Sequence, residues 1–381
     1  MLFLSGPRQV GKTTLVKAAM PIEPRLYFNW DSAQVRSAYR KDPAFFFKGE
    51  HHPEDWICFD EIHKRPHWKD ILKGIYDQYR DDCRFIITGS ALLETFKKSG
   101  DSLVGRYFNT HLFPINIGDF RKADFKLYAS ANDLVQEALE APGNPVINSL
   151  LEFGGFPEPF YKGTAEFWKR WSNQHRELII SQDLRDLTRI QDLDKIEALL
   201  EMLVPGIGSP VSNAALGQDL EAAHSTVKNW LLQLEKVQLI FPVPPYSKKL
   251  RNVFKKEKKW FFTDWRFAGD NRFENYIASL LNRAVVLWRD RFGENFDLNF
   301  VRTHEAKEVD FLITLDGKPY LLIEAKKGKP DILPAYYQFA QKLKVPCLVV
   351  TQLEGYARPV KNPDLVPMFQ LSASKLGHVL P

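Results

Sequence analysis

Cysteine, internal repeats and long apolar runs are scarce or absent in this sequence. The cysteines are odd in number, far apart and without a CxxC pair, which argues against an oxidising compartment and favours a reduced one; they are Cys58, Cys83 and Cys347. No apolar run is long enough to cross a bilayer, and the opening MLFLS leads straight into a glycine-rich loop instead of a signal peptide. These absences predict a cytoplasmic protein with no membrane partner.

The composition is that of an ordinary folded protein. Of the 381 residues, 44% are hydrophobic and 26% are charged, which argues against intrinsic disorder and is enough for two to three domains. The formal net charge of +5 is mildly basic. It permits nucleic acid as a partner without arguing strongly for it.

Residues 5–18, SGPRQVGKTTLVKA, match the phosphate-binding pattern GxxxxGK[ST] at every fixed position. A short apolar strand precedes this loop and a helix follows it, so backbone N–H groups at the start of the helix point at the phosphates. We predict that Lys12 reaches the β- and γ-phosphates of a nucleotide and that the Thr13 hydroxyl binds Mg²⁺. The predicted nucleotide-binding residues of the loop are Gly6, Pro7, Arg8, Gln9, Val10, Gly11, Lys12, Thr13 and Thr14.

Two carboxylates follow the next clear strand, in WICFDEIHKRPHW at 56–68. At this distance from a phosphate loop, Asp60 is predicted to hold Mg²⁺ through water, and Glu61 is predicted to orient the water that attacks ATP. The alternative is a solvated acidic loop. ATP and Mg²⁺ are therefore the expected cofactors.

Two further polar residues are candidates for the same site. A third apolar strand, in CRFIITGSALL, ends at Thr88, which we prefer to Ser90 as a contact for the γ-phosphate or the attacking water; a simple turn is the alternative. Arg106 in LVGRYF is a candidate finger that stabilises charge on the γ-phosphate of a neighbouring subunit. The alternative for Arg106 is a surface arginine that binds a helix end.

The alternation of short apolar strands with helices predicts a parallel sheet covered on both faces, with ligand at the carboxyl ends of its strands. GPRQVGKTTL, FDEIHKRPHW, ITGSA and LVGRYF together resemble a family of AAA-type P-loop ATPases of bacteria and archaea. GGFPEPF at 154–160 and RDL at 185–187 resemble the domain of unknown function that follows the ATPase in that family. The resemblance covers nearly the whole chain. It implies ATP hydrolysis, and many AAA relatives form rings.

The middle of the chain is predicted to be mainly helical. Residues 121–205 have helical spacing of apolar residues and suit a lid or linker over the nucleotide site.

Residues 206–262 suit a winged helix: a short helix ending near Asp219, a turn, a longer helix from the N-cap Ser225, and a two-stranded wing. The cations of the wing are candidate contacts for a nucleic-acid backbone; they are Lys248, Lys249, Arg251, Lys255, Lys256, Lys258 and Lys259. The alternative is a solvated hairpin on a protein-binding or spacer module.

Residues 263–381 are predicted to run helix, strand, strand, strand, helix, strand, an order that resembles the restriction-endonuclease-like fold, also called PD-(D/E)XK. In EVDFLITLDGKPYLLIEAKKG, a three-residue loop at Asp316–Lys318 would place Asp310 opposite Glu324 on the neighbouring strand. Two carboxylates that close repel each other unless a cation joins them, and oxygen ligands suit Mg²⁺ or Mn²⁺. Lys326 would then position water or balance charge on the phosphate.

Other residues of this domain are weaker candidates for the same centre. Glu274 on the first helix is a candidate further metal ligand, and Gln338 or Gln341 is a candidate for orienting the site. The alternative for the whole stretch is a charged, solvated hairpin on a fold that only binds nucleic acid.

The sequence therefore predicts an α/β multidomain protein. Its domains are a P-loop ATPase core with a parallel sheet at 1–120, a helical lid or linker at 121–205, a winged helix at 206–262 and a restriction-endonuclease-like α/β domain at 263–381. The predicted function is a Mg²⁺-dependent ATPase coupled to a nucleic-acid-binding domain, in which Asp310, Glu324 and Lys326 are the candidate nuclease residues. The alternative is a nucleotide-controlled switch whose C-terminal domain binds nucleic acid or protein and cuts nothing.

Overall fold

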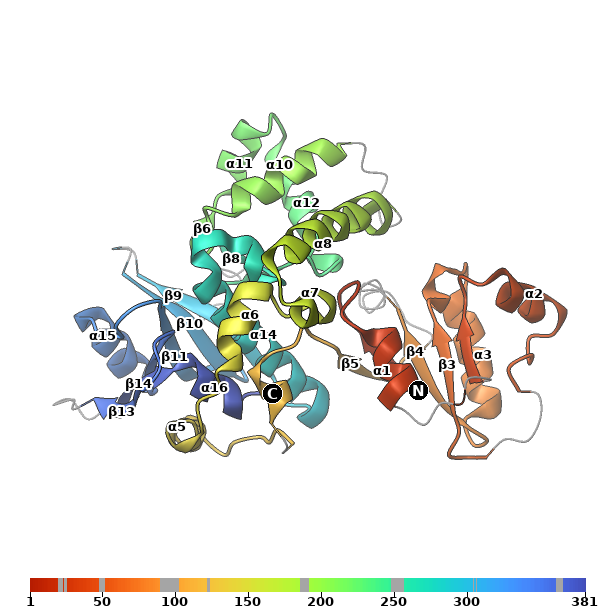
Figure 1. The fold of residues 1–381 in the computed structure, drawn as a ribbon, viewed down its shortest axis with the longest axis horizontal. Coiled ribbons are helices and arrows are strands. Elements are labelled where there is room, and N and C mark those ends of the chain that lie inside the picture. Colours follow the sequence, from red (N-terminus) through yellow and green to blue (C-terminus); the bar gives the residue numbers. More distant parts are fainter. Residues whose placement is uncertain are drawn as a thin grey trace. The chain divides into compact units, whose positions relative to one another are not determined.

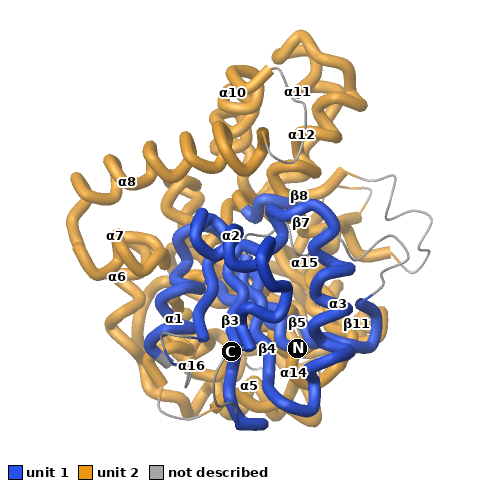
Figure 2. The backbone as a smooth tube through the Cα atoms, turned by 90° about the vertical axis from the view of Figure 1, so that its right-hand side faces the viewer, with its two compact units in different colours: residues 1–113, 236–238 blue, residues 114–235, 239–381 orange. Residues whose placement is uncertain are grey.

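A computed structural model of the chain describes residues 1–19, 23, 26–47, 52–89, 103–121, 124–185, 192–247, 257–303, 305, 307–360 and 366–381. Figure 1 labels its elements, with α for helices, β for strands and η for short 3₁₀- or π-helical segments. The chain divides into two compact units, residues 1–113 with 236–238 and residues 114–235 with 239–381 (Figure 2). Across the described ranges, none of the helices combines the length and the apolarity needed to cross a membrane.

The first unit is built on a parallel sheet, which confirms the prediction from alternating strands and helices. The sheet has five strands in the order β2-β3-β4-β1-β5, and each pairing is parallel. The elements of this unit are β1 Leu2–Ser5, α1 Lys12–Ala19, β2 Tyr27–Asn29, α2 Ala33–Lys41, β3 Trp56–Asp60, η2 Ile62–Lys64, α3 Trp68–Tyr79, β4 Arg84–Thr88 and β5 Phe108–His111.

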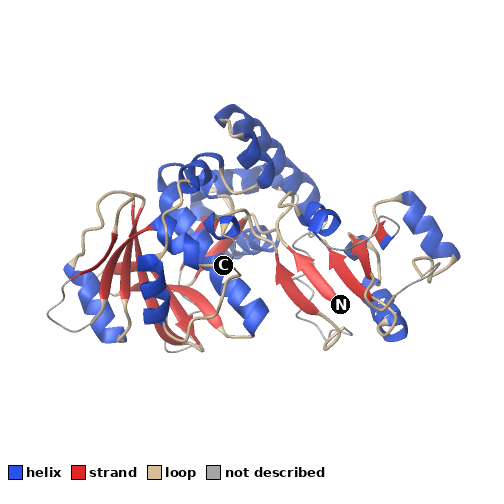
Figure 3. Ribbon diagram, turned by 60° about the horizontal axis from the view of Figure 1, so that its bottom comes forward, coloured by secondary structure: helices blue, strands red, loops and turns tan. Residues whose placement is uncertain are grey.

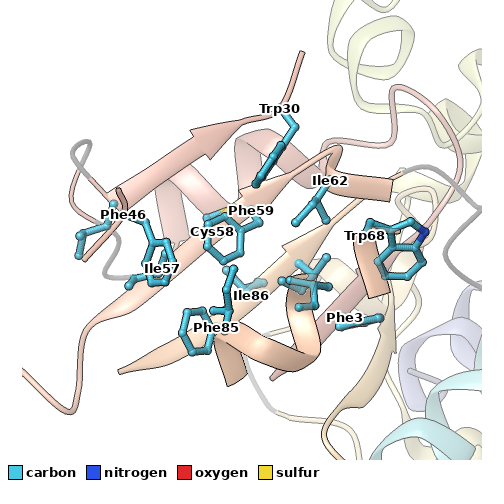
Figure 4. Close-up of a cluster of buried hydrophobic side chains, with 14 of the residues drawn as sticks. Phe3, Trp30, Phe46, Ile57, Cys58, Phe59, Ile62, Trp68, Phe85 and Ile86 are labelled. Atoms are coloured by element: carbon cyan, nitrogen blue, oxygen red, sulfur yellow. The ribbon is translucent and has the colours of Figure 1, made fainter. Parts of the chain in front are cut away.

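Strands β3 and β4 run through the hydrophobic core of the first unit (Figure 4). The adjacent residues Cys58 and Phe59 of β3 are both fully buried although their side chains point to opposite faces of the sheet, because both faces of these strands are covered. The rings of Trp30 and Phe46 pack edge-on against Phe59, at centroid distances of 6.2 and 5.3 Å. This packing fixes the carboxyl ends of the strands, where the predicted polar residues lie.

The second unit begins with helices that pack on the C-terminal part of the chain. This unit starts at Pro114. Arg283 of the same unit donates to the Pro114 carbonyl at 3.1 Å and to both carboxylate oxygens of Asp119 at 2.5 and 2.6 Å. The domain boundary at residue 120 stays a prediction. The elements are η4 Ile117–Phe120, α5 Ala131–Glu140, α6 Val146–Phe153, α7 Pro157–Lys162, α8 Ala165–Leu178, η5 Ile179–Leu184 and α10 Leu193–Leu203. Trp168 of α8 donates to Asp264 at 3.1 Å, so this predicted lid is joined to the second unit.

The two helices predicted for residues 206–262 are present (Figure 1), together with a small three-stranded sheet. Figure 3 colours the helices and strands of the whole chain by type. The elements are β6 Pro210–Val211, α11 Asn213–Asp219, α12 His224–Lys236, β7 Ile240–Val243 and β8 Lys258–Phe262, with strand order β6-β8-β7. Helix α12 begins at His224, so Ser225 lies inside the helix and is not its N-cap as predicted. Five of the seven cations predicted for the wing lie outside the described residues: Lys248, Lys249, Arg251, Lys255 and Lys256. Ser90, the alternative to Thr88 in the first unit, also lies outside them.

A six-stranded mixed sheet completes the second unit, in the order β13-β14-β12-β11-β10-β9. The elements are η6 Trp265–Asn271, α14 Arg272–Phe292, β9 Phe296–Arg302, β10 Glu308–Leu315, β11 Lys318–Lys326, α15 Pro334–Leu343, β12 Cys347–Thr351, β13 Ala357–Val360, β14 Met368–Ser372 and α16 Ala373–Val379. The predicted order of helix and strands is found as far as β12. The sequence analysis missed β13, β14 and α16, which extend the sheet beyond the predicted final strand.

The turn between β10 and β11 differs from the predicted three-residue loop. Leu315 pairs with Lys318, so only Asp316 and Gly317 form the turn. A β-bulge then shifts the register by one residue, because Ile313 pairs with Leu321 whereas Thr314 pairs with Pro319. The shorter turn and the bulge compensate each other, and the predicted opposition of Asp310 and Glu324 is retained.

Candidate functional site

The glycine-rich loop of the first unit joins β1 to α1 and has little room for side chains. A Cβ atom at Gly6 would lie 2.4 Å from the carbonyl oxygen of Leu112, and Gly11 has a φ of +100°, which disfavours any other residue. The Lys12 side chain is 8% exposed, and its Nζ donates to the carbonyls of Gly6 and Pro7, each at 2.8 Å. The loop therefore holds the Lys12 side chain against its own backbone.

Asp60 accepts hydrogen bonds from three hydroxyl groups at the edge of the parallel sheet. Thr13 Oγ1 donates to Asp60 Oδ2 at 3.2 Å, Tyr27 donates to the same oxygen, and Thr88 donates to Oδ1. Thr88 lies beside Asp60 in the pairing of β3 with β4. Burial and the neighbouring carboxylate raise the pKa of Tyr27. The structure thus brings together Thr13, Asp60 and Thr88 as expected, and adds Tyr27, which no sequence pattern singled out.

Glu61 begins a short η2 turn with a left-handed φ of +60°. Its carboxylate lies 3.3 Å from Lys64 Nζ and 3.6 Å from His63 Nε2. Burial raises the pKa of Glu61, and burial lowers the pKa of His63 to about 4, so His63 is neutral near physiological pH. A carboxylate with a raised pKa suits a base that must accept a proton from water. Neither His63 nor Lys64 was predicted as a neighbour of this site.

The residues at this edge fit a magnesium nucleotide. The chain contributes one ammonium group at Lys12, a hydroxyl at Thr13 that is already joined to Asp60, and a glycine loop that opens on the first turn of α1. Hydroxyl and carboxylate oxygens are ligands that Mg²⁺ prefers. When bound, Mg²⁺ would supply charge that stabilises the phosphate oxygens, with Thr13 and Asp60 as the residues that hold it.

Arg106, the predicted finger, lies against α3 of its own unit. Its Nε and Nη2 donate to the two carboxylate oxygens of Asp77, at 2.7 and 3.1 Å. The hydrogen bond from Arg106 lowers the pKa of Asp77. A role for Arg106 in a neighbouring subunit stays a prediction, and it would require this bidentate pair to open.

A second group of polar residues lies in the C-terminal sheet, where Asp310 and Glu324 face each other as predicted. The backbone N–H of Asp310 donates to Glu324 Oε2 at 3.1 Å, and the N–H of Ala325 donates to Asp310 Oδ2 at 3.0 Å. Glu324 Oε1 accepts from Lys326 Nζ at 2.7 Å and from the Tyr336 hydroxyl at 2.6 Å. Three of the four carboxylate oxygens of the pair are therefore engaged by donors of the chain itself.

The fourth oxygen faces a buried lysine. Lys259 Nζ lies 3.6 Å from Asp310 Oδ1, 2.6 Å from Glu308 Oε1 and 3.8 Å from Glu274 Oε1, and its side chain is 0% exposed. Burial alone would lower the pKa of Lys259, but the three carboxylates outweigh burial and raise it. The prediction that Lys259 contacts a nucleic-acid backbone is therefore wrong, because its ammonium group is the counter-ion of this carboxylate cluster. Lys258, by contrast, is partly exposed.

Glu274 of α14 lies near Asp310, as the sequence suggested, and its carboxylate also faces Lys259. Glu274, Glu308, Asp310 and Glu324 together form the carboxylate cluster. Burial and the nearby Asp310 raise the pKa of Glu274 to about 8. A Cβ atom at Gly208 would lie 2.4 Å from Glu274 Oε2, so this glycine makes room for the carboxylate. Gln338 and Gln341 are exposed on α15, and it is Tyr336 of that helix that reaches the cluster.

The carboxylate cluster as placed does not fit a metal ion. Its oxygens accept hydrogen bonds from the chain or face Lys259, whose ammonium group lies where a metal ion would be needed. Among the residues that the structure describes, no group of three or more histidine, cysteine, aspartate or glutamate side chains is arranged to hold a metal. The metal-binding role of Asp310 and Glu324 stays a prediction.

Two parts of the chain match known families of domains. Residues 1–121 match the family described as an AAA domain, and residues 145–268 match a domain of unknown function (DUF8612). The chain is 26% identical over 374 residues to the uncharacterized protein MJ1637 of Methanocaldococcus jannaschii, covering 86% of this chain and 76% of that protein. It is 21% identical over 347 residues to the uncharacterized protein Rv2008c of Mycobacterium tuberculosis, covering 87% and 71%.

Among solved structures, the chain has a slight likeness to that of the Aeropyrum pernix Orc1 protein in complex with DNA. The two are 15% identical, with 71% of this chain and 85% of that chain covered and a TM-score of 0.32. The resemblance to AAA-type ATPases is confirmed for the N-terminal part of the sequence. The chain thus carries an AAA domain, followed by a domain of unknown function and a mixed sheet.

Proposed function

We propose that the chain binds ATP and hydrolyses it with Mg²⁺ at the carboxyl edge of the parallel sheet. The observation that carries this proposal is the hydrogen bond between Thr13 and Asp60, at 3.2 Å, which joins the phosphate loop to the strand that bears the acidic pair. The match of residues 1–121 to an AAA domain supports it.

In this proposal each residue has one task. Lys12 leaves the carbonyls of its loop to contact the β- and γ-phosphates, and Thr13 and Asp60 hold the magnesium ion. Glu61 accepts a proton from the attacking water, because its carboxylate follows Asp60 at the same edge and burial raises its pKa. Thr88 keeps Asp60 in position through its hydrogen bond.

The test is steady-state ATP hydrolysis together with nucleotide binding. Glu61→Gln is expected to lower turnover by about a hundredfold or more while ATP still binds, because only proton transfer is removed. Lys12→Ala is expected to abolish both binding and turnover. Lys73→Ala, an exposed lysine of α3, is the matched control and should resemble the wild type. Equal turnover in all three variants would overturn the proposal.

For the C-terminal unit, we favour an ATP-controlled switch that binds nucleic acid or protein over a nuclease. The observation that favours the switch is the ammonium group of Lys259, which lies among the carboxylates where cleavage would need a metal. The observation that favours a nuclease is the pairing of Asp310 with Glu324 beside Lys326. Cleavage would require Lys259 to withdraw.

A nuclease assay separates the two proposals. Plasmid and single-stranded DNA would be incubated with the protein and Mg²⁺ or Mn²⁺, with and without ATP, alongside Asp310→Asn. Asp316→Asn, an exposed acid in the same hairpin, is the control. We expect no cleavage that depends on Asp310. Cleavage by the wild type and by Asp316→Asn, lost in Asp310→Asn, would establish the nuclease instead.

A further inference from the structure

A cavity of about 420 Å³ lies in the second unit, between α6, η6, the start of α14 and the ends of β11 and β12. Its volume is in the range of small-molecule sites. Its charged and polar lining includes Glu152, Arg266, Asp270, Arg272, Lys327 and Gln352. Lys327 and Gln352 directly follow the parallel strands β11 and β12, and carboxyl strand ends are a common place for ligands in α/β sheets.

The cations of this cavity outnumber its acids. In the part of the chain that the structure describes, none of Arg266, Arg272 and Lys327 forms an ion pair, although Glu152 and Asp270 line the same cavity. Glu152 and the buried Asp264 act on Arg266 electrostatically without pairing with it. The Nε atom of Arg266 is buried and has no hydrogen-bond partner among the described residues. The lining thus carries a small excess of positive charge and a buried donor that is free to bind.

Uncharged groups hold the two arginines close together. Arg272 donates from Nε to the Gly269 carbonyl at 3.3 Å and from Nη1 to the Leu151 carbonyl at 3.2 Å. The guanidinium carbon of Arg266 lies 4.8 Å from the centre of the Trp168 ring. Burial and the neighbouring Arg272 lower the pKa of Arg266, as expected for like charges held near each other. An anion between them would relieve this repulsion.

The start of α14 adds to the positive electrostatic potential of the cavity. This helix has 21 residues, begins at Arg272 and is preceded by Asn271, whose side chain makes no capping hydrogen bond. The N–H groups of the first turn of a helix lack partners within the helix, and its dipole is positive at this end. Guanidinium groups and helix N-termini both bind phosphate oxygens well.

We propose that this cavity binds the phosphate of a nucleotide unit, either a free mononucleotide or the 5′-phosphorylated end of a nucleic-acid strand. Arg266, Arg272 and Lys327 would contact the phosphate. Glu152 and Asp270 would accept hydrogen bonds from sugar hydroxyl or base amino groups, which explains acids in a cationic cavity. This site is distinct from the ATP site and does not depend on hydrolysis there.

The test measures binding in a Lys12→Ala background, so that the phosphate loop contributes little. Fluorescence anisotropy would compare a short single strand carrying a 5′-phosphate with the same strand carrying a 5′-hydroxyl, and calorimetry would measure AMP. Lys327→Glu and Arg266→Gln are expected to weaken binding by about tenfold or more, since each removes a charge-assisted contact. Lys329→Glu, two residues further on, exposed and outside the cavity lining, should change it less than about twofold.

Each outcome decides the proposal or its ligand. Binding of AMP that Lys327→Glu weakens identifies a free nucleotide, and binding of only the 5′-phosphorylated strand identifies a strand end. The proposal is overturned if neither probe binds, if the phosphorylated and hydroxyl strands bind alike without AMP binding, or if Lys327→Glu and Lys329→Glu behave alike. Lys327 is exposed, so its substitution leaves the core intact and remains informative even if Arg266→Gln, which loses its contact with Trp168, unfolds.

Discussion

Replacing Lys259 with methionine removes the cation that contacts Glu274, Glu308 and Asp310 together. Methionine keeps the length of the side chain but removes this shared counter-ion. Glu308 keeps a second cation, because Arg302 Nη1 lies 3.6 Å from its Oε2. Breaking a buried ion pair by removing one partner costs about 3 to 5 kcal/mol, because the remaining charge stays buried and unpaired. The three acidic side chains are 17 to 24% exposed, so water solvates them in part. We therefore expect a loss at the lower end, about 3 kcal/mol.

The assay is urea unfolding of the full chain, followed by circular dichroism and tryptophan fluorescence. The transition of the second unit should move to lower urea in Lys259→Met, and its melting temperature should fall by about 6 °C or more. Lys258→Met is the matched control, because Lys258 is the adjacent residue of β8, is partly exposed and lies 5.8 Å from the Trp260 ring centre instead of among acids. Its cost should stay within about 0.5 kcal/mol.

The dependence on pH separates a charge effect from a packing effect. Acid protonates carboxylates and removes the charge that Lys259 balances, so the difference between Lys259→Met and the wild type should shrink as the pH is lowered. A difference that is unchanged by pH would indicate a loss of packing alone. Equal stability of Lys259→Met and Lys258→Met near neutral pH would refute the view that Lys259 is the counter-ion.

Three further predictions follow from the same contacts. The pKa of Glu274 is raised from 4.5 to about 8, so its contribution to stability is present below pH 4.5 and is lost as the pH rises through about 8. Glu274→Gln should not show this loss and should become more stable relative to the wild type between pH 4.5 and about 8. Urea titrations at several pH values measure this difference. Gly208→Ala should cost about 1 to 3 kcal/mol, measured by thermal unfolding against the open, helical Gly74→Ala, because a Cβ at Gly208 meets Glu274 and its φ is +82°. Thr88→Val should raise the Mg²⁺ concentration needed for half-maximal ATP hydrolysis, because Asp60 loses one of its hydroxyl donors; an unchanged requirement would contradict that role.

Local patterns explain which parts of the fold and site could be predicted from the sequence. The phosphate loop is contiguous, so the spacing of Gly11, Lys12 and Thr13 carries nearly all the information about its geometry. Asp310 and Glu324 belong to one hairpin, and side-chain alternation along two strands is enough to place them opposite each other.

The remaining contacts depend on segments that are distant in sequence. Lys259 belongs to a run of lysines that looks solvated, and nothing in that run reveals that β8 places one of them among acids from β10 and α14. Tyr27 and Tyr336 read as ordinary apolar positions of a strand and a helix, because aromatic residues are common in cores. Their hydroxyl groups reach Asp60 and Glu324 only through tertiary packing.

The β-bulge between β10 and β11 lets a two-residue turn coexist with the pairing of Asp310 and Glu324. Tyr320 is the extra residue of β11, and it offsets a turn that is one residue shorter than a regular hairpin with Asp310 opposite Glu324 would need. If the same residues paired without the bulge from Leu315 and Lys318 onward, Asp310 would lie opposite Ile323, and Glu324 would turn to the other face of the sheet. Deleting Tyr320 would remove the bulge and leave the two acids paired, so the bulge residue is dispensable for the pairing whereas the register that it sets is not.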